Sequence, residues 1–141
     1  MSWILSSVTM ARVPACSVSW QSEPAILCRP CFSAHLHAAG GDCVETIRKY
    51  HDRLAAVYFK DYFIKDAGIG LDNWPARLRF CELNGGNAGM DFAPIVRELR
   101  DHKFDKWALI EHDTHLREPE IDLKKSADIL KDLFGTRQEV K

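Results

Sequence analysis

Two short apolar segments, each followed by polar residues, decide the fold: residues 54–61 read LAAVYFKD and residues 107–113 read WALIEHD. A nearly continuous apolar run of this length suits a strand covered on both faces, as in a parallel sheet. Polar side chains follow each run directly, at 60–61 and at 111–113. The two segments predict parallel strands with polar groups at their carboxyl ends.

Helical patterns alternate with these strands. Asp42 is placed to cap a helix that begins at Cys43, and Asp91 to cap a second helix over the 90s. A third helix is expected after Pro119, with Gly135 as its stop signal. A further strand is expected near Ala25–Phe32. The order of helices and strands predicts an α/β fold with right-handed crossovers between parallel strands.

The connections between these elements are less regular. The segment 61–77 contains glycine, asparagine and proline, and it is predicted to be a loop; loops of that length inside a domain are usually functional. A brief extended piece is expected over 78–83, followed by the glycine-rich stretch 84–89, which reads NGGNAG.

Composition restricts the function classes. The chain has 141 residues, a net charge of −1 and 46% hydrophobic residues, which predicts one globular domain with no excess of cations for binding nucleic acid. No apolar run reaches the ~18 residues that would span a bilayer. The five cysteines lack a regular spacing, and the one Cys-x-x-Cys, Cys28 and Cys31, has no second pair, so reduced thiols and a cytoplasmic location are expected.

The chain ends differ from the middle. Met1 to Gln21 contains no acidic residue and one basic residue, Arg12, too few for a mitochondrial leader. We therefore expect a poorly packed N-terminal extension over 1–26, a domain over 27–135 and a C-terminal tail over 136–141. A complete (β/α)₈ barrel takes about 250 residues and eight strands. The three or four strands predicted here make half of a TIM barrel at most.

Four motifs carry a resemblance to a known family. They are HLHAAGGD at 35–42, YFKD at 58–61, FCEL at 80–83 with the glycine stretch, and WALIEHD at 107–113. In this order and spacing they resemble the C-terminal half of the xylose-isomerase-like barrels, over roughly residues 27–134. That superfamily contains sugar isomerases and epimerases, hydroxypyruvate isomerase and inosose dehydratase. The resemblance implies a truncated barrel and a small sugar or keto-polyol as substrate.

The resemblance also implies a divalent metal, Mn²⁺, Mg²⁺ or Co²⁺, held by a Glu, an Asp, a His and a final Glu. Glu111 matches the final Glu, as metal ligand and catalytic carboxylate. Phe32 stands at the Asp position and Tyr58 at the His position, and neither side chain suits these ions. The remaining Glu belongs to the barrel half that this chain lacks. One ligand of four is therefore present, and the metal is expected to be weakened or lost.

Other matched positions are expected to bind substrate. The family implies that Lys60 contacts an anionic or polyhydroxylated ligand, although a solvated lysine at a strand end is the alternative. His35 is expected to hydrogen-bond substrate or to be structural, and Trp74 to stack on a sugar or to pin its loop. Asn84 stands where the family has a glycine. Since alternate residues of a strand face opposite sides, Glu111 and Asp113 should share a side that His112 does not.

Three functions remain open. The first is an isomerase, epimerase or dehydratase acting on a small sugar or keto-polyol, whose missing ligands come from another chain. The second is a catalytically inactive remnant, and the third is a sugar-binding module without metal chemistry. An open half-barrel exposes sheet edges and one apolar face, so we expect a homo-oligomer that completes the barrel or a marginally stable fold.

Overall fold

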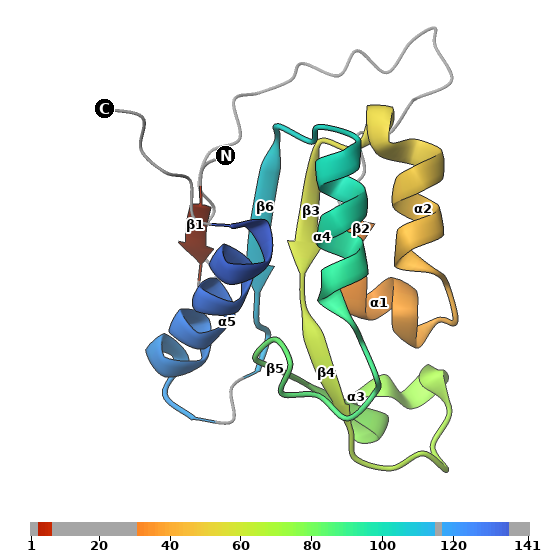
Figure 1. Ribbon diagram of the computed structural model, residues 1–141. Coiled ribbons are helices and arrows are strands. Elements are labelled where there is room, and N and C mark those ends of the chain that lie inside the picture. The colour runs from red at the N-terminus through yellow and green to blue at the C-terminus, as the bar shows by residue number, and fades with distance from the viewer. Residues whose placement is uncertain (1–2, 7–30, 115–116, 136–141) are drawn as a thin grey trace, which may run out of the picture.

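The computed structural model describes residues 3–6, 31–114 and 117–135 of the chain. Its main sheet has four parallel strands in the order β1-β6-β3-β2 (Figure 1). Their bounds are Trp3–Ser6 for β1, Cys31–Phe32 for β2, Ala56–Phe59 for β3 and Trp107–Glu111 for β6. An antiparallel pair, β4 (Asp61–Ile64) and β5 (Leu78–Cys81), lies beyond the carboxyl ends of β3 and β6.

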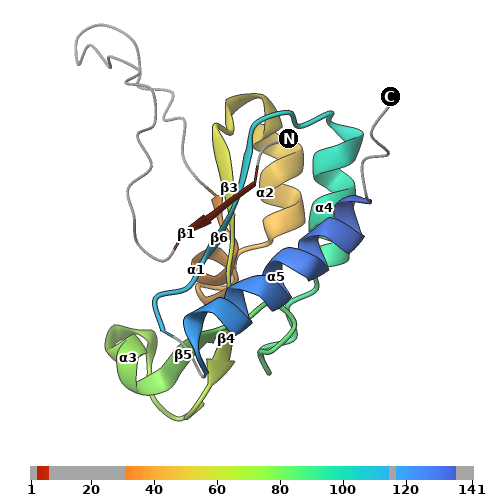
Figure 2. The same cartoon turned by 90° about the vertical axis from the view of Figure 1, so that its left-hand side faces the viewer.

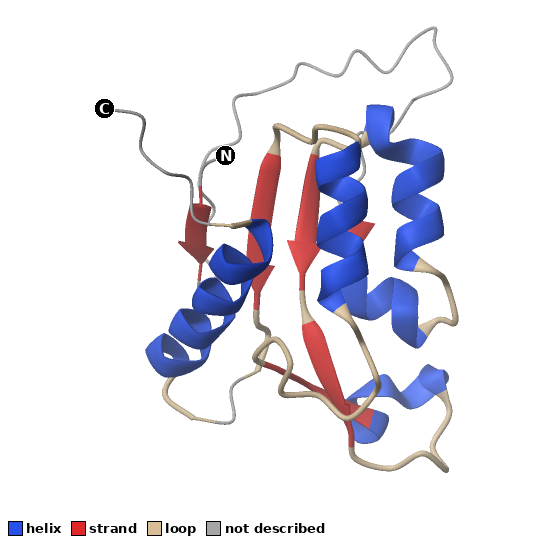
Figure 3. Cartoon of the chain, viewed as in Figure 1, coloured by secondary structure: helices blue, strands red, loops and turns tan. Residues whose placement is uncertain are grey.

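The three longer helices lie on one side of the main sheet, as Figure 2 shows. They are α2 (Cys43–Tyr50), α4 (Phe92–Asp101) and α5 (Pro119–Phe134). Shorter turns of helix, coloured blue in Figure 3 where they are α-helical, complete the chain: α1 (Ser33–Ala38), α3 (Trp74–Arg77), η1 (His51–Arg53) and η2 (Leu71–Asn73). No helix in the described part of the chain is long and apolar enough to cross a membrane.

The predicted caps of the main helices are confirmed. The Asp42 carboxylate accepts a hydrogen bond from the Glu45 amide at 3.0 Å, and the Asp91 carboxylate accepts one from the Ala93 amide at 2.9 Å. Each bond satisfies an amide that has no partner inside its own helix. At the other end, α5 stops before Gly135, whose φ of 77° lies in the region that favours glycine.

The hydrophobic core lies between the sheet and these helices. The sheet contributes buried side chains from its two central strands to this core: Val57 and Phe59 of β3, and Ala108 and Ile110 of β6. The alternate residues face the other way: Tyr58 and Leu109 are half-buried, and Trp107 is 40% exposed. The sequence predicted strands covered on both faces, whereas the described helices cover one face. The opposite face of these strands carries Tyr58, Trp107 and Leu109.

The α/β class with parallel strands is confirmed, and two local predictions are wrong. Residues 61–77 are not a plain loop, because 61–64 pair with 78–81 as a hairpin and 71–77 are helical. Trp3–Ser6, inside the predicted extension, pair with β6 as a strand. Most of the extension, with Cys28 and residues 25–30 of the expected early strand, lies outside the described residues, as does the tail over 136–141.

The glycine-rich stretch after β5 is fastened to the hairpin. Asp61 is buried, and its carboxylate accepts hydrogen bonds from the amides of Tyr62 at 2.7 Å and Gly86 at 3.2 Å. Burial raises the pKa of Asp61, and these amide donors oppose that rise. Asn84 has a φ of 59°, which explains why a glycine would also suit this position.

Asn87 closes the outer side of the hairpin. Its side-chain amide accepts from the Ile64 backbone N–H at 2.6 Å and donates to the Ile64 carbonyl at 3.1 Å. One side chain therefore occupies both pairing groups of an edge residue, as a neighbouring strand would.

Gly86→Ala should destabilise the fold more than Gly89→Ala. A methyl group on Gly86 would overlap the Tyr62 carbonyl oxygen and an Asp61 carboxylate oxygen, whereas one on Gly89 would meet nothing within 4 Å. Gly89 has a φ of 76°, so its substitution should cost the ~1–2 kcal/mol of a left-handed residue. Urea unfolding should show a clearly larger loss for Gly86→Ala, and equal losses would contradict the close approach.

Candidate functional site

The three predicted site residues, His35, Lys60 and Glu111, lie together at the carboxyl ends of the parallel strands. The Lys60 ammonium nitrogen is 3.0 Å from Glu111 Oε1 and 4.0 Å from the centre of the Phe80 ring. The His35 ring packs on the same Phe80, with ring centres 5.2 Å apart. Three segments that are distant in sequence therefore meet around one aromatic ring, and we name this group, with Asp113, the lysine cluster.

Backbone pairing fixes the position of Lys60. The Ser33 hydroxyl donates to the Lys60 carbonyl and accepts from the Lys60 amide, each at 2.9 Å. Ser33 begins α1 directly after β2, so its hydroxyl extends the contact between β2 and β3 by one residue. The Lys60 side chain is 0% exposed. The alternative of a solvated lysine at the strand end is therefore wrong.

Two carboxylates hold the Lys60 ammonium. Besides Glu111, Asp113 approaches it, with Oδ2 2.7 Å from Nζ. Glu111 and Asp113 thus share a side, as the alternation along the strand predicts. His112 faces the other way and is buried, with Nε2 3.1 Å from the Ser126 hydroxyl. The expected arrangement of residues 111–113 is confirmed.

His35 is affected by the same charges. Burial, followed by the neighbouring Lys60 ammonium, lowers the pKa of His35 below 6.5, and Glu111 and Asp113 oppose this only in part. The imidazole is therefore neutral at pH 7. A neutral imidazole has one donor and one acceptor nitrogen, which suits a hydroxyl group.

Aromatic rings form one wall of the site. Trp74, an exposed residue of α3, packs against Phe80 with ring centres 5.7 Å apart. The Thr114 hydroxyl donates to the Phe80 carbonyl at 2.8 Å and ties the segment after β6 to β5. Aromatic side chains with a few placed polar groups are the usual composition of a small-molecule site. Both roles predicted for Trp74 remain compatible with this position.

The two carboxylate oxygens of Glu111 differ in their hydrogen bonding. Oε1 accepts from Lys60, while the buried Oε2 has no hydrogen-bond partner within the described structure. A buried carboxylate oxygen without a donor costs free energy. Oε2 is therefore an acceptor of this cluster whose hydrogen-bonding capacity is unused within the described residues.

The residues present do not fit the divalent metal that the resemblance implies. Phe32 pairs with Tyr58 across β2 and β3, and Tyr58 pairs with Leu109 across β3 and β6. The positions that the resemblance assigns to metal ligands thus lie on neighbouring strands, but Phe and Tyr occupy two of them. An ammonium already neutralises Glu111, and no group of three or more His, Cys, Asp or Glu among the described residues is arranged around a common point.

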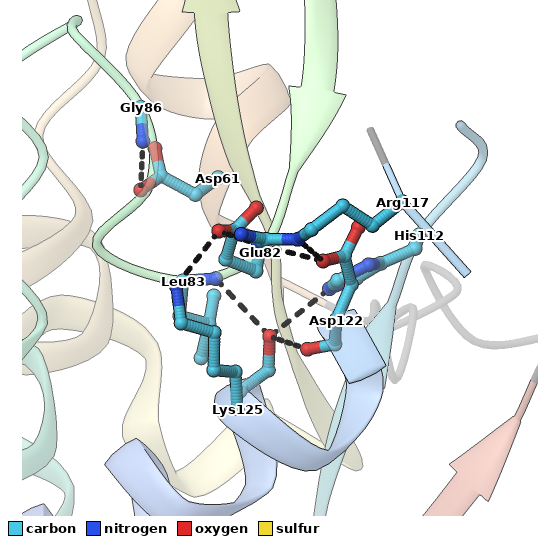
Figure 4. A network of polar contacts seen from close by, with 9 residues as sticks. Asp61, Glu82, Leu83, Gly86, His112, Arg117, Asp122 and Lys125 are labelled. Carbon is cyan, nitrogen blue, oxygen red and sulfur yellow. Dashed lines mark hydrogen bonds and ion pairs between the residues drawn. The ribbon is translucent and has the colours of Figure 1, made fainter. Parts of the chain in front are cut away.

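A second polar network lies behind the cluster and holds the start of α5 (Figure 4). Arg117 Nε donates to Asp122 at 2.9 Å, its Nη2 pairs with Glu82, and Lys125 donates to Glu82 at 3.1 Å. Ser126 accepts from the Leu83 amide at 3.1 Å. Burial acts to raise the pKa of Glu82, but its own amide, Lys125 and Arg117 together lower it. This network fixes α5 against the ends of β5 and β6.

Sequence reasoning missed Ser33 and Phe80 as parts of the site. Ser33 directly follows β2, just as Lys60 directly follows β3. This shared position after a strand could have identified Ser33 as a site residue. Phe80 lies on a hairpin strand whose direction, antiparallel to β4, was not visible in the sequence.

A separate cavity of about 260 Å³ shares no residue with the lysine cluster. It opens between the turn before α2 and the start of α4, and His37, Asp42, Met90, Asp91 and Ile95 are among its lining residues. Asp42 and Asp91 are occupied there as helix caps. The convergent charged groups lie in the lysine cluster, so we place the candidate site there.

Lys60→Met should lower the free energy of unfolding by about 1–3 kcal/mol, because two carboxylates lose their counter-charge. The loss should stay below that of a fully buried pair, since the Glu111 and Asp113 side chains are 30% and 41% exposed. Adding Glu111→Gln should restore part of it, as measured by urea unfolding of both single variants and the double variant. Lys124→Met, which removes an exposed pair with Asp128, is the control and should change little. Simple additivity of the first two substitutions would contradict the coupling.

The titration of His35 should follow Lys60. Proton NMR should give a His35 midpoint below 6.5, and Lys60→Met should raise it, because the ammonium is removed while the carboxylates remain. A lowered pKa in the folded state means that His35 stabilises the fold fully above pH 6.5 and progressively less as the pH falls below it. Lys124→Met should leave the midpoint unchanged. A wild-type midpoint at or above 6.5 would contradict the arrangement.

Comparison with models of protein families and with curated proteins gives no match for this chain. The geometry of the lysine cluster therefore carries the functional argument.

Proposed function

We propose that this chain is a relative of the xylose-isomerase-like enzymes that binds a small sugar or keto-polyol at the lysine cluster. The observation that carries the proposal is Glu111, whose Oε1 is held by Lys60 while its buried Oε2 has no donor among the described residues. A hydroxyl group of a sugar supplies such a donor. The location at the carboxyl ends of parallel strands is where α/β folds bind their ligands.

Each part of the cluster has a distinct role in this proposal. Glu111 and Asp113, which are partly exposed, accept hydroxyl donors, and neutral His35 adds a further contact. The aromatic wall of Phe80 and Trp74 packs against the C–H groups of the ring or chain. Lys60 is a positioning residue, because its buried ammonium orients the two carboxylates without reaching the surface.

The charge of the cluster favours a neutral ligand. One ammonium faces two carboxylates, and His35 is neutral at pH 7, so the cluster carries about one negative charge. A phosphorylated sugar would meet repulsion there, because like charges at close range cost free energy. Binding is expected to be independent of divalent metal, since the residues present do not fit one.

Proton transfer by Glu111 is the second candidate function, and the same unpartnered oxygen favours it. Glu111 Oε2 would take the proton from the hydroxyl-bearing carbon next to a substrate carbonyl, which leaves an enediolate, and return it to the former carbonyl carbon. The proton of the hydroxyl group on the first carbon passes to the former carbonyl oxygen, so that the two groups exchange places. No electron acceptor is needed. The Lys60 ammonium lies beside this carboxylate and would offset the developing negative charge.

Binding should be measured by NMR and calorimetry with xylose, xylulose and an inosose, with and without EDTA. Wild type should bind at least one neutral sugar, EDTA should have no effect, and the phosphate ester of the same sugar should bind more weakly. Glu111→Gln should weaken binding by about tenfold or more, the value of one hydrogen bond to a charged group. Glu118→Gln, an exposed residue before α5, is the matched control and should bind as wild type does.

The outcomes separate the two candidates. Binding of sugar without deuterium uptake in D₂O supports the binding role alone, and uptake that Glu111→Gln abolishes adds proton transfer. Equal binding by wild type and Glu111→Gln would refute the site, and a requirement for Mn²⁺ would refute its independence of metal.

A further inference from the structure

Two histidine rings are stacked at the amino ends of β3 and β6, at the opposite end of the sheet from the lysine cluster. His51 begins η1, which leads into β3, and His102 follows α4 and precedes β6 (Figure 1). Their ring centres are 3.8 Å apart and their planes differ by 16°. We name this pair the imidazole stack. It joins the end of the α2–η1 segment to the end of α4.

Hydrogen bonds fix which nitrogen of each ring carries a proton. His51 Nδ1 lies 3.2 Å from the Arg48 carbonyl oxygen, which can only accept, so this nitrogen is the donor. His102 Nε2 lies 3.1 Å from Glu98 Oε1 and donates to that carboxylate. A neutral imidazole has a single N–H, and both rings use theirs in these bonds. An added proton therefore goes to His51 Nε2 or to His102 Nδ1.

The charges around the imidazole stack balance one added proton. Arg48 donates to Glu98 from Nε at 3.1 Å and from Nη2 at 2.9 Å, and it also pairs with Glu45. These bonds from Arg48 are the main cause that lowers the pKa of Glu98, so the carboxylate stays ionised as the pH falls toward 5. Two carboxylates and one guanidinium sum to one negative charge. The exposed charged residues within two positions of either histidine add four positive and two negative charges, which oppose a second proton: Lys49, Arg53, Arg100, Lys103, Asp52 and Asp101.

We propose that the imidazole stack is an acid-sensitive contact, which holds α2 and η1 against α4 with at most one added proton and opens when a second arrives. The first proton is balanced by the surplus negative charge and turns the bond between His102 and Glu98 into an ion pair. The second proton would place two imidazolium rings 3.8 Å apart. Even in water, two unit charges at about this distance repel by an amount worth about fivefold in an equilibrium constant. Separation of the rings relieves that repulsion.

The geometry of the stack suits protons and does not suit a shared metal ion. The lone pair of an imidazole nitrogen lies in the plane of its ring. Because the two planes are only 16° from parallel, their lone pairs do not converge on one ion at the about 2.0 Å of a metal–imidazole bond. Acidity is therefore the signal to which this pair can respond.

Acid acts on this contact in one direction. An ordinary imidazole takes up its proton below about pH 6.5, and separated rings can both do so, whereas the closed stack accommodates one. The open state thus binds more protons, and the closed state loses stability as the pH falls below about 6.5. Opening releases the turns at the two helix ends. There the Leu54 amide donates to the His51 carbonyl at 3.4 Å, and the Phe104 amide to the Leu99 carbonyl at 2.9 Å.

Amide hydrogen exchange of the full chain tests this opening. Protection factors, which remove the intrinsic dependence of exchange on pH, should be compared at pH 7.5 and pH 5. Leu54 and Phe104 should lose protection by about fivefold or more in acid. Val57 and Ala108, buried residues that pair between β3 and β6, should lose less.

Two variants identify the group responsible. His51→Phe keeps an aromatic ring in the stack but cannot take up a proton, so it should abolish the loss at Leu54 and Phe104. His37→Phe is the matched control. It also replaces a half-buried histidine whose Nδ1 makes one hydrogen bond, here with the Tyr62 hydroxyl at 2.9 Å, and it should respond to acid as wild type does. Far-UV circular dichroism at both pH values should show that the variants fold.

Three results would overturn the proposal. Wild type could keep the same protection at both pH values, or His51→Phe could lose protection as wild type does. In the third, Val57 and Ala108 lose as much protection as Leu54 and Phe104, which would mean that acid unfolds the whole domain. The measurement needs no ligand and involves no residue of the lysine cluster, so its outcome is independent of the proposed function.

Discussion

A buried ammonium is the constraint on which the carboxyl end of this sheet depends. Removing a lysine head group from water costs several kcal/mol, and partners at hydrogen-bond distance must offset that cost. Lys60 has two, at 3.0 and 2.7 Å, and both follow or end β6, while the Lys60 backbone is clamped by Ser33 after β2. Three strand ends are therefore held by one residue, through its backbone and its side chain. The contacts that form the candidate site are also the contacts that hold the carboxyl end of the sheet together.

Under the proposed relationship to the xylose-isomerase-like enzymes, an ammonium stands where those enzymes hold a divalent metal. A divalent ion needs several anionic or imidazole ligands, and Phe32 and Tyr58 stand at two of the positions that the resemblance assigns to such ligands. The Lys60 ammonium satisfies Glu111 with one charge and no further ligands. An ammonium is the weaker electrophile, because it polarises a substrate carbonyl less than a divalent cation does. Sugar binding without metal requires no such polarisation.

The local signals in the sequence were reliable where one residue dictates one backbone bond. Asp42, Asp91 and Gly135 predicted helix ends correctly, because caps and stop signals act over a few residues. The alternation that separates Glu111 and Asp113 from His112 is equally local. Lys60 shows the limit: its burial follows from Asp113 and Phe80, which are distant in sequence, and no periodic pattern reports them. β1 and β4 were missed because both depend on a partner strand far along the chain.

Asn87 protects the outer edge of the β4–β5 hairpin against pairing with another strand. A strand edge that accepts any neighbour leads to aggregation, and proteins avoid this by blunting the edges they do not use. The Asn87 amide takes both backbone groups of Ile64, so the outer side of the hairpin cannot recruit a strand at that point. Pairing of another strand along β4 is thereby discouraged at this residue. A single amide side chain thus protects a strand edge against aggregation.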